Sequence, residues 1–365
     1  MEKFIHIRGL KFVEHTVFCV SENGQKTFFD PIHQKTCALS SGQQVKRSIM
    51  TAIASEFGQS MPVTTFTKKV TINKDGNKKI GEGHIITEPD IKNSYHLVGG
   101  FWKSVANEKG DSVSRRSPLK ISGMTPIHPL LATVYKEDIS HNRKNTENTF
   151  IKFIYGSKND EAPRGKNGQE VPKEELDEIL KAVDKKMTDY SPTQFIKDQK
   201  RTSGLFKFDI EIDLRKLFAI NLSETDPEIY PEEIEHLKEN GWKEIEYDFG
   251  KALVAPKEIR DKIGRAVAKG IMKWKIDSNQ STTYSPMETM AMIISNEATH
   301  ITSAIRGELI DDDKAKLIVD DSIEKVFCSD SLKAIILYRK KSNDIKDAEN
   351  YIFEKIMEFD FENQK

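Results

Sequence analysis

Cysteine is scarce in this sequence, and the few thiols are not clustered. Only three of the 365 residues are cysteine. Cys19, Cys37 and Cys328 are odd in number and form no CxxC pair, so we expect neither a disulfide framework nor a cysteine zinc site. The nine histidines are scattered without ligand spacing. The sequence therefore predicts no metal centre and no cofactor.

Long apolar runs and catalytic signatures are missing as well. No stretch approaches the roughly 18–20 apolar residues of a membrane span, and the opening MEKFIHIRGLKF lacks the apolar core of a signal peptide. The nucleotide-binding and hydrolase patterns GxGxxG, GxxxxGKS/T, HExxH and GxSxG do not occur. We expect a cytoplasmic protein without a membrane partner, and no motif indicates an enzyme class.

An excess of charge of one sign is also lacking, since 56 Lys and Arg residues face 57 Asp and Glu residues. The charges are unevenly distributed, however. Residues 1–150 carry 21 basic and 14 acidic side chains, a balance of +7, whereas the remainder carries 35 and 43, a balance of −8. Such a division suits a protein with one anion-facing surface, or copies that stack with opposite charges in contact.

Residues 39–57, LSSGQQVKRSIMTAIASEF, form the best-marked element of the chain. Either Ser40 or Ser41 can cap a helix, and each has a glutamine three residues later, which is the capping-box spacing. Apolar residues then repeat at three- and four-residue intervals and predict a helix with one buried face: Val45, Ile49, Met50, Ile53 and Phe57.

The opening turns of this helix are basic. Lys46 and Arg47 lie where the helix dipole already presents partial positive charge, which costs roughly 0.3–1 kcal/mol for each added cation. A bound anion would reverse the sign of that contribution. The hydroxyl, amide and cationic side chains of this region therefore predict a phosphate-binding seat: Ser40, Ser41, Gln43, Gln44, Lys46 and Arg47. A solvated helix with a basic exposed face is the alternative.

A second pattern suited to phosphate lies in residues 114–130, SRRSPLKISGMTPIHPL. Arg115 and Arg116 place paired guanidinium groups beside the Ser117 hydroxyl, an arrangement that can hold a phosphate by forked hydrogen bonds. Lys120 follows within a short predicted strand. Structural salt bridges are an equal alternative for this segment.

Asp30 is the single candidate for catalysis. It precedes Pro31 in the loop before the basic helix, where a carboxylate near a phosphodiester could assist strand cleavage; a turn-initiating aspartate is the alternative. Three further carboxylates, Asp209, Glu211 and Asp213, alternate along one strand. Their spacing is that of a solvated strand face, and we expect no metal site there.

The remaining patterns predict a mixture of strands and helices. Period-two alternation marks strands at residues 4–12 and 205–214. Residues 63–72 and 79–87 predict a Lys-rich hairpin, which either protects an exposed edge or reaches across a nucleic acid. Helices are predicted at 174–187, 256–276, 285–299, 314–325 and 343–359, strands at 150–155 and 334–338, and an exposed loop or insertion at 156–175.

Four blocks, taken in chain order, resemble one known family. SSGQQVKRSI follows a first strand and loop, SRRSPLKISGM lies near residue 115, and GLFKFDIEIDL precedes the long predicted helix APKEIRDKIGRAVAKGI. The blocks span the chain from its start to residue 276. In this order and spacing the sequence resembles the Cas-seven (DevR-type) branch of the RAMP superfamily, the backbone subunits of type I CRISPR effector complexes.

The resemblance implies an α+β fold. It consists of an RRM-like (ferredoxin-like) palm with an antiparallel sheet and helices, plus an inserted thumb hairpin and a helical or irregular subdomain. The whole chain would form a single domain with insertions. The palm would take about residues 1–60 and 200–280, the insertions 61–200, and further helical and strand elements 281–365.

The resemblance also implies a function that is not enzymatic. Several copies would line up along a CRISPR guide RNA and present it for pairing with target DNA in antiviral defence. The implied partners are the guide RNA, target DNA, other copies of the chain, and Cascade subunits of the Cas-five, Cas-six and large-subunit types. The implied RNA contacts are the two basic blocks: Ser40, Ser41, Gln43, Gln44, Lys46, Arg47, Arg115, Arg116, Ser117 and Lys120.

Two other functions are open at this stage. A type III-like relative would cleave target RNA through Asp30 and a divalent ion. A stand-alone RRM-like protein would bind RNA without a guide of fixed length. Regularly spaced cuts in complementary RNA, abolished by Asp30→Ala, distinguish the enzyme from the other two.

Overall fold

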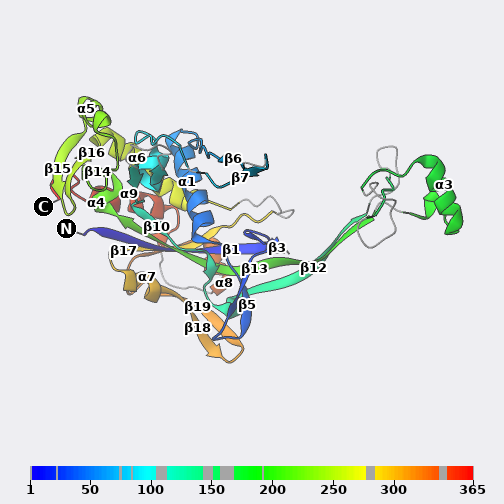
Figure 1. The fold of residues 1–365 in the computed structure, drawn as a ribbon. Coiled ribbons are helices and arrows are strands. Elements are labelled where there is room, and N and C mark those ends of the chain that lie inside the picture. Colours follow the sequence, from blue (N-terminus) through cyan, green and yellow to red (C-terminus); the bar gives the residue numbers. More distant parts are fainter. Residues whose placement is uncertain are drawn as a thin grey trace. The chain divides into compact units, whose positions relative to one another are not determined.

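The computed structural model describes residues 2–21, 24–73, 76–83, 85–103, 113–142, 151–156, 168–190, 193–276, 284–336 and 343–364. The chain divides into one unit of Met1–Tyr135 with Arg201–Lys365 and a second unit of Lys136–Lys200. The second unit lies inside the predicted insertion 61–200. Figure 1 shows the elements in chain order by colour.

A large sheet forms the centre of the first unit. Its central strand, β1 (Phe4–Thr16), lies between β13 (Thr193–Asp213) and β17 (Thr289–Ser295) and is antiparallel to both. Beyond β17 come β20 (Val326–Cys328) and β21 (Asn343–Asp344), and beyond β13 come β3 (Gly24–Gln25) and β2 (Val20–Ser21). Three more strands pair with β13: β10 (Leu119–Ile121), β11 (Thr125–Pro126) and β12 (Ala132–Asn142).

The two strands predicted from alternation are confirmed and are longer than predicted. Residues 4–12 lie in β1 and residues 205–213 in β13. Phe206, Phe208, Ile210 and Ile212 are buried, as their period of two requires. Leu214 instead begins the short helix α4 (Leu214–Leu217).

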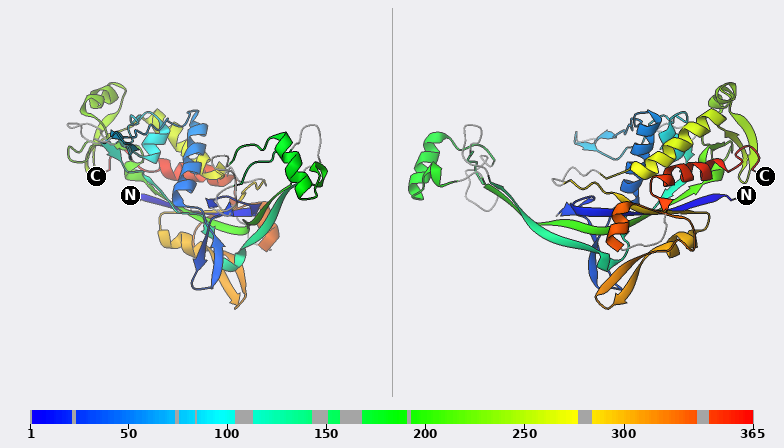
Figure 2. Two further views of the ribbon diagram at one scale, coloured as in Figure 1. Left: turned by 45° about the vertical axis from the view of Figure 1, so that its right-hand side comes forward. Right: turned by 180° about the vertical axis from the view of Figure 1, so that it is seen from behind.

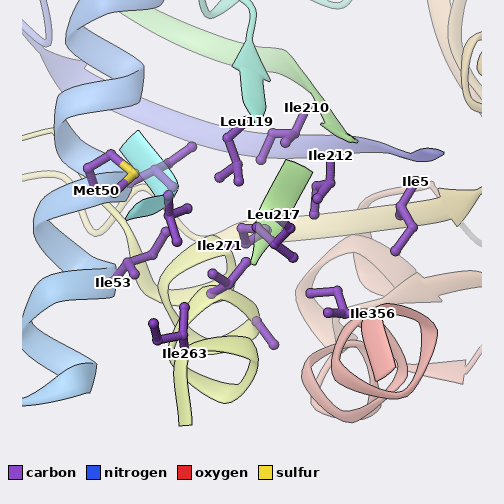
Figure 3. Close-up of a cluster of buried hydrophobic side chains, with 14 of the residues drawn as sticks. Ile5, Met50, Ile53, Leu119, Ile210, Ile212, Leu217, Ile263, Ile271 and Ile356 are labelled. Carbon is purple, nitrogen blue, oxygen red and sulfur yellow. The ribbon is translucent and has the colours of Figure 1, made fainter. Parts of the chain in front are cut away.

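Three helices cover one face of the large sheet: α1 (Gly42–Phe57), α6 (Lys257–Lys273) and α9 (Asp347–Met357). Figure 3 shows their inward side chains, including Ile53, Ile271 and Ile356, meeting Ile5 and Ile212 of the sheet. The predicted helices 39–57 and 256–276 are confirmed. Their apolar stripes are the sides that pack on this core.

A second, smaller core lies on the other face of the sheet. Met290 and Ile293 of β17 belong to this cluster, whereas Met292 and Ile294 belong to the first. The covering elements are α7 (Ala298–Ala304), α8 (Asp330–Ile336) and the hairpin of β18 (Ile305–Asp311) and β19 (Lys314–Val319). The predicted helix 285–299 is therefore wrong. Its apolar residues belong to β17, which is buried on both faces, so they follow one another without the apolar–polar alternation of a half-buried strand.

Two other predictions near the C-terminus also need correction. Residues 314–319 form the strand β19 and not a helix, because their alternating side chains face the second core and solvent in turn. Residues 334–336 end the helix α8 and do not begin a strand, and the rest of that predicted strand lies outside the described residues. The predicted helix 343–359 is confirmed as α9, which is preceded by β21.

Smaller elements complete the described chain. The predicted hairpin at 63–87 contains β6 (Val70–Ile72) and β7 (Lys78–Ile80), with residues 74 and 75 outside the described part. The second unit contains α3 (Lys173–Ala182), which begins one residue before the predicted helix 174–187 and otherwise lies within it. It also contains an isolated β-bridge at Ile154. Residues 157–167 of the predicted loop lie outside the described chain. Two further hairpins are formed by β4 (Thr27–Asp30) with β5 (Lys35–Ala38) and by β8 (Phe101–Lys103) with β9 (Val113–Arg115). A separate sheet has the strand order β14 (Ala219–Asn221), β16 (Gly250–Val254) and β15 (Lys243–Tyr247). Two further helices are α2 (Ser94–Gly99) and α5 (Pro231–Glu239).

The architecture is α+β with a large mixed sheet, and the RRM-like palm stays a prediction. Residues 281–365, predicted as separate C-terminal elements, supply β17, β20 and β21 to the large sheet. In the part of the chain that the structure describes, no helix combines the length and the apolar character needed to cross a membrane.

Candidate nucleic-acid interface

The amino end of α1 is held firmly against the large sheet. Ser41 is the N-cap, and its Oγ accepts a hydrogen bond from the backbone N–H of Gln44 at 3.3 Å. The backbone N–H of Ser40 donates to the carbonyl of Met124 at 2.9 Å. Gly42, the first helical residue, lies so close to the sheet that a Cβ there would be 2.9 Å from the Ile121 carbonyl oxygen. The helix start predicted from sequence is therefore correct and rigidly placed.

A groove of about 1100 Å³ follows the exposed side of α1 and is closed by the chain that leaves α6. Its lining on α1 includes the apolar Ala52 and a polar stripe that recurs every three or four residues, at Ser41, Gln44, Ser48, Thr51 and Ser55. With a rise of 1.5 Å per residue, this stripe extends for about 20 Å. The spacing places one hydroxyl or amide on each successive turn of the helix.

The charged residues of the groove are all cationic. Arg47 lines it from α1, and Lys273 and Lys275 line it from the end of α6, whereas none of the described lining residues is acidic. Glu56 lies near the far end of α1 and pairs with Lys273 at 2.7 Å and with Lys269 at 3.8 Å. Because cations line the groove together with hydroxyl and amide groups, the groove favours a polyanion with many hydrogen-bond acceptors.

The six side chains predicted as a phosphate seat divide into two groups. Ser41, Gln43, Gln44 and Arg47 line the groove. Ser40 is fully buried and Lys46 is half-buried, and neither of them lines it. Burial lowers the pKa of Lys46. The prediction is corrected for Ser40, whose side chain is buried, whereas Lys46 lies outside the groove lining and its contact with RNA stays a prediction.

Gln44 has a structural bond in addition to its position in the groove. Its Nε2 donates to the carbonyl of Phe18 at 2.8 Å, so the side chain does not close the predicted capping box. Gln43 and Arg47 are exposed. They are the side chains of the predicted seat that extend furthest into solvent.

Arg115 is not available to a ligand. It is buried in β9, and its guanidinium donates to the carbonyls of Leu97 at 2.8 Å and Ala219 at 2.9 Å. It also donates to the Lys216 carbonyl at 2.6 Å and forms an ion pair with the Glu228 carboxylate. The predicted paired-arginine phosphate site is therefore wrong, because each of the three guanidinium nitrogens of the buried Arg115 donates to a protein acceptor.

The neighbours of Arg115 have different surroundings. The Ser117 hydroxyl bonds to the carbonyls of Val98 and Leu119, which corrects its prediction as an RNA contact. Lys120 is exposed and pairs with Glu211 of β13 at 2.6 Å, its cross-strand neighbour. Arg116 is exposed and does not line the groove.

Asp30 shapes the turn between β4 and β5. Its Oδ1 accepts hydrogen bonds from the backbone N–H groups of Ile32 at 3.0 Å and His33 at 2.8 Å, and it lies 3.2 Å from Nδ1 of His33. The hydrogen bond from the His33 backbone is the main cause that lowers the pKa of Asp30. The carboxylate therefore has the bonding of the turn-initiating alternative.

No metal centre emerges from the described residues, among which no three or more His, Cys, Asp or Glu side chains are grouped to hold an ion. Cys19, Cys37 and Cys328 are buried free thiols.

Several groove residues were not predicted as functional from the sequence. Ser48, Thr51 and Ser55 continue the polar stripe beyond Arg47, and their spacing of three and four residues is visible in the sequence once the apolar face is known. Lys273, the last residue of α6, and Lys275, just after the helix, lie more than 200 residues away. Only the packing of α6 on α1 brings them to the same groove.

No protein-family model matches the chain, and no curated protein matches it. The chain is similar to chains of CRISPR RNA-guided surveillance complexes. A structure titled "CRISPR RNA-guided surveillance complex, pre-nicking" is 10% identical over 80% of this chain and 77% of that chain, with a TM-score of 0.44. A second, titled "CRISPR RNA-guided surveillance complex", is 10% identical over 84% of this chain and 76% of that chain, with a TM-score of 0.38.

Both TM-scores lie below 0.5, so these similarities do not identify the groove along α1 as an interface.

Proposed function

We propose that this chain binds guide RNA along the α1 groove as a backbone subunit of a CRISPR effector complex. Several copies bind one RNA, each holding a short stretch of its sugar-phosphate chain. The bases stay exposed for pairing with target DNA, so sequence recognition is delegated to the RNA. The chain itself needs no catalytic residue for this role.

The observation that carries the proposal is the composition of the groove. Four of the six side chains predicted from sequence as a phosphate seat line it together with Lys273 of α6 and Lys275 just after that helix, and no described lining residue is acidic. Hydroxyl, amide and cationic donors recognise phosphate and ribose oxygens, which are the same for every nucleotide. Trp274 lines the groove but is buried, so it provides no exposed platform for stacking a base.

The test is the salt dependence of RNA binding. Each phosphate contact to single-stranded nucleic acid contributes about −0.7 to the slope of log K against log salt concentration. We expect Arg47→Ala with Lys275→Ala to weaken binding of a short single-stranded RNA and to make the slope shallower by about 1.4, as two contacts are lost.

The matched control is Lys46→Ala, which removes a cation one position from Arg47 but outside the groove. We expect its slope to equal that of the wild type. If Lys46→Ala changes the slope and Arg47→Ala does not, RNA follows another path on the surface. If the wild type binds no RNA, the proposal is refuted.

A further inference from the structure

The β6–β7 hairpin has an aliphatic surface that the described residues leave exposed. Its register places Val70 opposite Ile80 and Ile72 opposite Lys78, so these four side chains share one face. Val70, Ile72 and Ile80 are 64%, 65% and 76% exposed. Val63 and Phe66, further along the same arm, are exposed as well.

Such a hairpin has little stability by itself. A two-stranded sheet that buries neither face is at best marginally stable in water, and a contiguous exposed apolar surface marks an interaction site. All six residues of β6 and β7 are exposed. A partner that covers the aliphatic face would therefore stabilise the hairpin.

The charges around this face are mostly positive, with Glu82 as an exposed acidic residue beside the strands. Lys68, Lys69, Lys78 and Lys79 are exposed along the two strands. We call the hairpin with these lysines the basic hairpin. The lysines and the exposed ring of Phe66 would suit RNA. The three aliphatic side chains Val70, Ile72 and Ile80 do not stack on bases, and their burial favours a protein surface.

A surface of the opposite charge occurs at the tip of the β18–β19 hairpin. Asp311, Asp312 and Asp313 are exposed there beside Leu309 and Ile310, which are 49% and 60% exposed. We call these five residues the acidic tip. Lys314, opposite Asp311, is an exposed cation at the same tip, so the charge of the tip is negative on balance. The ion pairs recorded for this hairpin instead join Glu308 to Arg306 and to Lys316, away from the tip.

From this complementarity we propose that the basic hairpin of one copy docks on the acidic tip of the next copy. Aliphatic side chains of the two surfaces bury one another, and the aspartates face the lysines. The inference rests on the proposed function, in which copies line up along one RNA. It adds the two surfaces through which neighbouring copies recognise each other.

The positions of the two surfaces favour contact between copies over contact within one chain. Figures 1 and 2 show β6–β7 on the α1 side of the large sheet and β18–β19 on the opposite side of that sheet. The two surfaces are different, so the contact is heterologous and leaves one free copy of each surface at the ends of a pair. Repeating the contact adds further copies in a row.

The experiment is a charge exchange measured by sedimentation velocity, on the full chain alone and on a long single-stranded RNA. The hairpin variant carries Lys68→Glu and Lys78→Glu, which lie on the aliphatic face by the period of two, and the tip variant carries Asp311→Lys and Asp312→Lys. We expect either variant to raise the concentration needed for assembly by about tenfold. The protein that carries all four changes should assemble as the wild type does, because opposite charges again face each other.

The control variant carries Lys257→Glu and Lys262→Glu, which reverse two exposed charges on α6 away from both surfaces; its assembly should equal that of the wild type. A wild type that stays monomeric both alone and on long RNA overturns the inference, as does a four-fold variant that does not recover assembly. Binding of a short RNA is measured separately. If the hairpin variant loses binding of the short RNA and the tip variant keeps it, RNA occupies the hairpin and the inference is overturned. If the wild type does not bind the short RNA, the proposed function has failed.

Discussion

Gly270 of α6 packs directly on Ile53 of α1, at the point where the two helices cross. A Cβ at position 270 would lie 2.4 Å from Cγ1 of Ile53 and 2.8 Å from its backbone nitrogen. The absence of a side chain therefore allows the two backbones to approach. This approach brings the end of α6, with Lys273 and Lys275, to the groove along α1.

We expect Gly270→Ala to separate the two helices. Overpacking of this kind costs about 1–3 kcal/mol, and urea denaturation should show a loss of unfolding free energy in that range. Because the groove is formed by both helices, the affinity for single-stranded RNA should fall as well.

Gly264 of the same helix supplies the control for Gly270. A Cβ at position 264 would lie 3.4 Å from Sδ of Met357 and 3.4 Å from the ring of Phe353, which is ordinary contact or slightly tighter. Alanine is favoured over glycine in a helix interior by up to about 1 kcal/mol, so Gly264→Ala should be neutral or stabilising. Equal losses in the two variants would show that the helix crossing does not depend on Gly270.

Arg115 provides the second prediction, which concerns stability and not RNA. Arg115→Met leaves the Glu228 carboxylate and three carbonyl groups without the guanidinium donors that they now have. Removing one partner of a buried ion pair costs about 3–5 kcal/mol, and we expect a loss of this size in urea denaturation. The exposed neighbour is the comparison: Arg116→Met should change the unfolding free energy by less than about 0.5 kcal/mol. Similar losses for both arginines would contradict the structural role.

The sequence alone was sufficient to place α1 and part of its functional side. The capping serine, the buried stripe and the basic opening turn are local features, and four of the six residues predicted there line the groove. Local spacing could not separate Arg47 from Lys46, because adjacent helical residues differ by about 100° in direction and the groove depends on where α6 packs.

The sequence misled where the deciding partners are remote. The acceptors of Arg115 include Ala219 and Glu228, both more than 100 residues away, so the motif that resembles a phosphate clamp is a structural anchor. The run around Met290–Ile294 was predicted as helical because β17 is covered on both faces and loses the strand period. The role of Asp30 was ambiguous because an aspartate directly before a proline fits both a turn and a catalytic loop.

Lys11 gives the last prediction, a pH dependence of stability. Its side chain is buried, with Nζ donating to the Met287 carbonyl and to Oγ1 of Thr289 at 3.0 Å each, and lying 4.6 Å from the centre of the Trp274 ring. Burial lowers the pKa of Lys11 from 10.5 to about 7. Between these two values the unfolded chain holds a proton that the folded chain has lost, so the contribution of Lys11 to stability rises with pH above about 7 and is constant below it. Lys11→Met removes this titration and keeps the neighbouring Lys273, Lys275 and Glu288. We therefore expect the difference in unfolding free energy, wild type minus variant, to increase between about pH 7 and about pH 9 in urea denaturation. A difference that stays constant or decreases over that interval would show that Lys11 keeps its proton in the folded protein.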